Sequence, residues 1–130
     1  YAPVSQIWEL SDMLATGRML SLSAETELNG KPLAGRQFDT SYTGLKSEAD
    51  GRIHTWLREP KSGRTVTQLF DRLFTQCIVY TPPHREAICL EPYTCLPDSF
   101  RLTAEGHKTG LQELAPGQAK ETRISIAVSG

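Results

Sequence analysis

The stretch "CIVYTPPHREAICLEPY" (77–93) contains two short apolar runs that each stop at or close to proline. The first run, "CIVYT" (77–81), is rich in β-branched and aromatic residues, and the second, "EAICL" (86–90), comes shortly before Pro92. Such residues favour strands, whereas proline lacks the backbone N–H that a sheet requires. The stretch therefore predicts two short strands.

The same strand pattern occurs at four other places along the chain. These runs are "MLSLSA" (19–24), "RIHTWL" (52–57), "TVTQLF" (65–70) and "TRISIAV" (122–128). The last run alternates apolar and polar residues, which places Ile124, Ile126 and Val128 on one face. Six short strands predict an all-β fold, an antiparallel β-sandwich.

Turn-forming residues separate these runs. They occur in "NGKP" (29–32), "ADG" (49–51), "PKSG" (60–63) and "PG" (116–117), and three of these turns are suited to closing hairpins. In addition, "SDML" (11–14) and "DRLF" (71–74) each predict a single helical turn.

The composition indicates one soluble domain. The chain has 130 residues, of which 38% are hydrophobic and 22% charged. Its 14 basic and 15 acidic side chains nearly balance, so the charge gives no reason to expect a nucleic acid or an anionic membrane as partner. No apolar run approaches the roughly 20 residues that span a bilayer. A neutral or small polar partner is expected.

The cysteines and histidines match no metal-binding pattern. Cys77, Cys89 and Cys95 fit neither zinc nor redox spacing, and free thiols in a reducing compartment, the cytoplasm, are expected. The three histidines are scattered without a second ligand at a suitable spacing. No metal and no cofactor is predicted.

Strand parity predicts where the carboxylate of Glu91 lies. If residues 85–91 are extended, Glu91 shares a face with Cys89, while Leu90 lies on the opposite face. Pro92 then places Glu91 at the last position of the strand, near the rim of the sheet, where a carboxylate can face a cleft. The alternative is a surface carboxylate paired with Arg85 or Arg101.

Four ordered segments resemble the aldose 1-epimerase (galactose mutarotase) family. They are "ATGR" (15–18), "FDTSYTGL" (38–45), "VYTPPHREAICLEPYTCLPDSF" (79–100) and "GLQELAPGQ" (110–118). The family has a Pro-Thr-Gly-Glu segment, an Asp-containing sugar-binding segment, a strand that delivers a glutamate, and a Leu-x-Pro-Gly turn. Ala15 and Arg18 depart from the first of these.

The resemblance implies that residues 1–130 are the C-terminal half of a larger galactose-mutarotase-like supersandwich. It assigns the catalytic base to Glu91 and a ligand of the sugar hydroxyls to Asp39. The family's acid histidine, with a second histidine and an arginine that bind sugar, belongs to the N-terminal half and has no counterpart here. The implied activity is interconversion of α and β anomers of an aldose without metal or cofactor. The implied partners are the sugar and the N-terminal half, with self-association as an alternative.

Other interpretations stay open on the sequence. Asp39 lies in "DTS", which is ordinary turn composition. Tyr93 and Phe100 are suited to forming walls of a cleft beside Glu91, but packing in the core is the preferred interpretation. The whole domain is alternatively a non-catalytic carbohydrate-binding module. A hexose-6-phosphate 1-epimerase would need a cluster of basic residues near Glu91 and Asp39, and none is evident.

Overall fold

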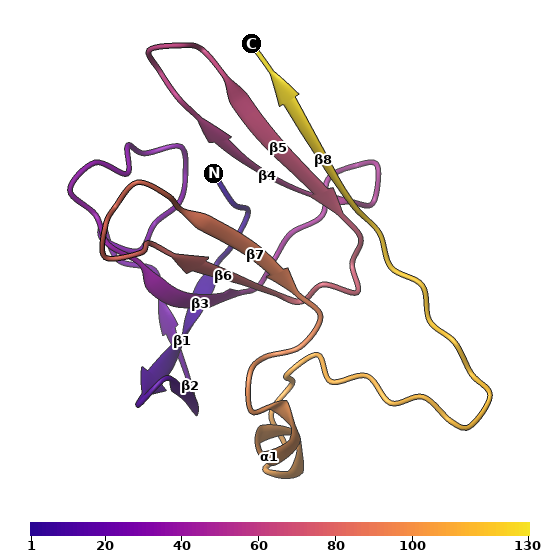
Figure 1. Cartoon of the computed structure of the whole chain (residues 1–130). Coiled ribbons are helices and arrows are strands. Elements are labelled where there is room, and N and C mark those ends of the chain that lie inside the picture. Colours follow the sequence, from indigo (N-terminus) through magenta and orange to yellow (C-terminus); the bar gives the residue numbers. More distant parts are fainter.

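The protein consists of two antiparallel sheets and one short helix (Figure 1). A computed structural model describes all residues from Tyr1 to Gly130. The strands are β1 (Gln6–Ser11), β2 (Leu14–Ser21), β3 (Asp39–Thr43), β4 (Ile53–Arg58), β5 (Thr65–Phe70), β6 (Gln76–Tyr80), β7 (Cys89–Tyr93) and β8 (Ile124–Ser129), and the helix is α1 (Ser99–Ala104). The all-β sandwich-like fold predicted from the sequence is confirmed.

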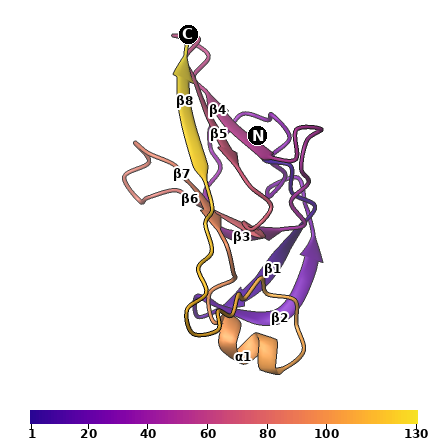
Figure 2. The same ribbon diagram turned by 90° about the vertical axis from the view of Figure 1, so that its right-hand side faces the viewer.

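The chain moves between the sheets three times. The larger sheet has the order β2-β1-β3-β6-β7 and the smaller one the order β4-β5-β8. The chain enters the small sheet after β3, returns after β5, and reaches β8 last, after α1 and a long connection (Figure 1). Figure 2 shows α1 at the opposite end of the molecule from the C-terminus.

The main core lies on one face of the large sheet. It contains Tyr42 on β3, Cys77 and Val79 on β6, and Phe38 and Leu28 from the preceding loop, all at most 6% exposed. Burial raises the pKa of the Cys77 thiol to about 12, so this cysteine remains protonated. All three cysteines are free thiols.

A second cluster joins the opposite face of the large sheet to α1. Trp8, Ala15, Leu96 and Leu102 form it, and none is more than 2% exposed. The segment around α1 therefore covers only one end of that face. The uncovered remainder of the face is where the candidate site lies.

The predicted strands are largely confirmed, with shifts at the ends, but the strand predicted at 86–90 overlaps β7 only at residues 89–90. The strand predicted at 65–70 is β5, and those predicted at 52–57 and 77–81 are β4 and β6 within one residue. The strand predicted at 19–24 begins earlier, at Leu14, because it pairs with β1, which the sequence analysis missed together with β3. The turn predicted at 60–63 closes the β4–β5 hairpin.

Both predicted helical turns are wrong. Residues 11–14 form the connection of the β1–β2 hairpin, in which Asp12 and Met13 adopt positive φ angles of 49° and 69°. Residues 71–74 form a simple turn in which the Asp71 carboxylate accepts the backbone N–H of Leu73. Hairpin pairing and a side-chain hydrogen bond satisfy these backbones locally, so no helix is needed.

The last strand has an exposed apolar face. Ile124, Ile126 and Val128 lie on one face, as predicted, but their exposed fractions are 43%, 64% and 70%.

The structure also has no helix that is both long and apolar enough to cross a membrane.

Candidate functional site

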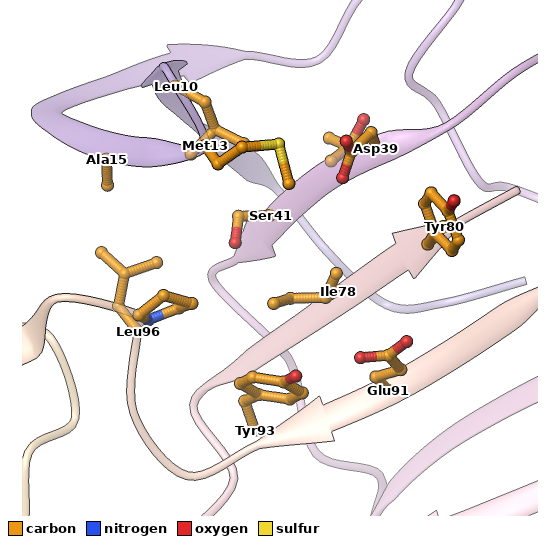
Figure 3. A pocket seen from close by; sticks show the side chains of 12 residues that line it. Leu10, Met13, Ala15, Asp39, Ser41, Ile78, Tyr80, Glu91, Tyr93 and Leu96 are labelled. Carbon is orange, nitrogen blue, oxygen red and sulfur yellow. The ribbon is translucent and has the colours of Figure 1, made fainter. Parts of the chain in front are cut away.

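A pocket of about 500 Å³ opens on the face of the large sheet that lies opposite the main core (Figure 3). Strands β3, β6 and β7 form its floor, the β1–β2 hairpin forms one wall, and the segment before α1 forms another. The lining residues are Leu10, Met13, Ala15, Asp39, Thr40, Ser41, Ile78, Tyr80, Glu91, Tyr93, Leu96 and Pro97.

Glu91 projects into this pocket from β7. It stands directly opposite Ile78 of β6, which in turn stands opposite Ser41 of β3, so the three side chains form one row across the floor. The predicted face of Glu91 is therefore correct. Its predicted place at the end of the strand is wrong, because β7 runs from Cys89 to Tyr93 and includes Pro92. β7 is an edge strand, where the absent N–H of proline leaves the ladder to β6 intact.

Asp39 lines the same pocket as the first residue of β3. It stands opposite Tyr80, which stands opposite Cys89, two residues before Glu91. Two strand spacings and this offset separate the Cα atoms of Asp39 and Glu91 by roughly 12 Å. The segment "DTS" is strand rather than the turn considered from its composition. The structure thus brings the two predicted site residues onto one surface.

Neither carboxylate is neutralised by a basic side chain. No ion pair of the structure includes Asp39 or Glu91. Arg85 donates to the backbone carbonyl of Arg36, and Arg101 pairs with Asp98 and Glu105, so the surface pairs considered for Glu91 do not form. No lysine or arginine lines the pocket. Both carboxylates are free to accept hydrogen bonds from a ligand.

Tyr93 is a pocket residue, although the preferred interpretation of the sequence places it in the core rather than as a wall beside Glu91. The expected core position is wrong for both aromatic residues, because Tyr93 is 37% exposed beside the site and Phe100 is 79% exposed on α1. Tyr93 lies two residues after Glu91 on the same face of β7 (Figure 3). The interaction of its hydroxyl with the Glu91 carboxylate raises the pKa of Tyr93. Parity along β7 was the available signal for this residue.

The apolar side of the pocket is built by the β1–β2 hairpin and the segment 96–97. The guanidinium of Arg101 donates to the backbone carbonyl of Ala15 at 2.8 Å and so ties α1 to the hairpin. Within "ATGR", Thr16 and Arg18 both contact Glu9 of β1. Gly17 has a φ of 93°, and a Cβ there would lie 2.7 Å from Nε2 of His107, so only glycine fits.

The histidines lie away from the pocket. His54, His84 and His107 are not among its lining residues. The chain also has no group of three or more His, Cys, Asp or Glu side chains placed to hold a metal ion. The pocket offers the two carboxylates, the hydroxyl groups of Ser41, Tyr80 and Tyr93, and an apolar wall. This combination suits a small, neutral, hydroxyl-rich ligand.

A comparison with models of known protein families finds none that matches the chain. The fold and the site themselves define the class of protein: a two-sheet β-protein with an open, acidic pocket on the face of its larger sheet.

Proposed function

We propose that this chain is the C-terminal half of an aldose 1-epimerase-like isomerase, with Glu91 as general base and Asp39 as a ligand of the sugar hydroxyls. The observation that carries the proposal is that both residues, selected by the resemblance from separate segments, line one pocket. The pocket volume of about 500 Å³ is ample for a monosaccharide.

In the proposed reaction, Glu91 accepts the proton of the C1 hydroxyl of the sugar. The electron pair of that O–H bond forms the carbonyl at C1, the bond between C1 and the ring oxygen breaks, and the ring oxygen takes a proton from an acid. Rotation about the C1–C2 bond and reversal of these steps give the other anomer. A base and an acid placed on opposite sides of the sugar are sufficient for this chemistry.

The acid is expected outside this chain, because none of its three histidines lines the pocket. The histidine of the implied N-terminal half would supply that proton. The chain alone should then bind sugar without turning it over. A hexose-6-phosphate is less well accommodated, since no lysine or arginine of the pocket is available to the phosphate.

The test is the variant Glu91→Gln in the chain combined with its upstream half. Glutamine keeps the size of the side chain but cannot accept the proton, so mutarotation should fall by roughly 10²–10⁴-fold. Polarimetry on freshly dissolved α-glucose or α-galactose measures the rate. Glu86→Gln is the matched control, because Glu86 is exposed and lies outside the pocket.

Sugar binding should survive in Glu91→Gln, as judged by titration. A rate within a factor of about two of the parent would contradict the role of Glu91 as base. If the parent combination binds sugar but does not accelerate mutarotation above the spontaneous rate, the protein is instead a carbohydrate-binding module.

A further inference from the structure

Met13 occupies a backbone conformation that methionine normally avoids. Asp12 and Met13 are the two residues between β1 and β2, and both have positive φ angles, 49° and 69°. Two-residue hairpin turns of this kind favour Asn-Gly or Asp-Gly, since glycine alone reaches the left-handed region without steric cost. Aspartate fits the first position, but methionine at the second opposes the backbone. Non-glycine residues held in this way cluster at functional sites.

The side chain of Met13 lies over the pocket. It is 70% exposed and lines the pocket, and Figure 3 shows its thioether extending from the hairpin toward Asp39 and Ser41. The only other methionine, Met19, is also exposed (50%) and lies on β2 of the same hairpin, but does not line the pocket. Of the two exposed methionines, only Met13 lines the pocket.

The floor beneath Met13 has an apolar centre between polar ends. Ile78 lies in the middle of the row formed with Ser41 and Glu91, and Asp39 lies on the same face of β3 as Ser41. A ligand on this floor would have an apolar side chain on each side and carboxylates around its edge. A pyranose ring presents C–H groups on its faces and hydroxyls at its edge, which matches this arrangement.

We propose that Met13 contacts the substrate: its thioether packs on the C–H face of a pyranose held between Asp39 and Glu91. The inference rests on the proposed sugar-binding function and adds a contact to it. It gives a reason for a methionine at a position where a glycine would relieve the backbone. A flexible, polarizable side chain of this kind adapts to an apolar surface that varies between sugars.

Methyl NMR tests the contact directly. The chain is labelled at the methionine methyl groups and at backbone ¹⁵N, mixed with the unlabelled upstream half and titrated with D-galactose or D-glucose. The chain has two methionines and hence two methyl signals. The Met13 signal should shift with the sugar, together with the amides of Asp39 and Glu91, while the Met19 signal stays in place.

The outcomes separate this inference from the proposed function. If the amides of Asp39 and Glu91 shift and the Met13 methyl does not, the contact is absent while the sugar site stands. If neither the amides nor the methyl shifts at saturating sugar, the sugar site itself is overturned, and the contact with it.

A substitution gives an independent test. Removing the Met13 side chain should increase the stability of the protein but decrease its affinity for sugar. Met13→Gly should raise the Tm by roughly 2–5 °C by relieving the left-handed backbone. It should also weaken sugar binding by roughly 3- to 10-fold through loss of one apolar contact. Asp12→Gly is the matched control, since it changes the same turn outside the pocket and should leave binding unchanged. Unchanged or tighter binding in Met13→Gly would overturn the proposal.

Discussion

Glu91 owes its orientation to the alternation of side chains along β7. Its neighbour Leu90 packs against the main core, whereas Glu91 and Tyr93 face the pocket. A shift of one residue in the pairing with β6 would bury the carboxylate and expose the leucine. The burial of Leu90 against the core therefore determines the direction in which the Glu91 carboxylate points.

Asp39 should behave differently from Glu91 when its charge is removed. Asp39→Asn retains the shape of the side chain but weakens its hydrogen bonds to sugar hydroxyls, so KM should rise by roughly 10- to 100-fold, the value of a charged acceptor. The KM should change at least as much as kcat, because a ligand rather than a proton acceptor is altered. Steady-state polarimetry of the reconstituted protein separates the two constants. A fall in kcat with KM unchanged would contradict the ligand role.

At the scale of elements, a buried hydrogen-bond network joins β1 of the hairpin to β6 and to the segment after α1. The indole N–H of Trp8 on β1 donates to Gln76 of β6 at 3.0 Å, and the Gln76 amide donates to Thr75 and to the backbone carbonyl of Thr109. Gln76 is 1% exposed, and no buried side-chain N or O atom of the protein lacks a partner. The network holds β1, β6 and the segment after α1 together beside the pocket.

Gln76→Leu should destabilise the protein by about 1–3 kcal/mol, because it leaves the buried Trp8 N–H without an acceptor. Adding Trp8→Phe removes that orphaned donor, so the double variant should lose less stability than the sum of the two single variants. Urea unfolding at one fixed protein concentration measures all four forms of the cycle. Additivity within about 0.5 kcal/mol would show that the two side chains act independently.

At the scale of the whole molecule, the sandwich is open along β8. This strand pairs only with β5, carries no charged residue, and exposes Ile124, Ile126 and Val128. Isolated edge strands are usually protected by charge, proline or a bulge, and β8 has none of these. We therefore expect another polypeptide to cover this face, most simply the proposed N-terminal half, with self-association when that half is missing.

Ile126→Lys should reduce this association by placing a charge in the middle of the apolar face. Ser125→Lys is the matched control, since it adds the same charge to the opposite face of the same strand. Sedimentation of the parent chain alone should show association at micromolar concentration, and sedimentation of both variants shows which face is responsible. A parent chain that is a stable, cooperatively folding monomer under these conditions would contradict the expectation.

The sequence by itself determined the class of fold and the face of the sheet on which Glu91 lies. Short β-branched runs bounded by proline and turn residues allow little but strands, so β4, β5 and β6 were predicted nearly to the residue. Parity also predicted the face of Glu91, because successive side chains of a strand point to opposite faces of the sheet. These features depend on neighbours in the chain, which the sequence contains.

Only the tertiary structure decided how those residues form a site. β1 and β3 gave weak local signals and become strands by pairing with partners distant in the sequence, such as β3 with β6. Pairing with β6 likewise extends β7 past Pro92, since an edge position tolerates a missing N–H. Met13 and Tyr93 join the pocket because the hairpin and the edge strand meet around one sheet face. Such contacts come from packing between segments, which local propensity does not encode.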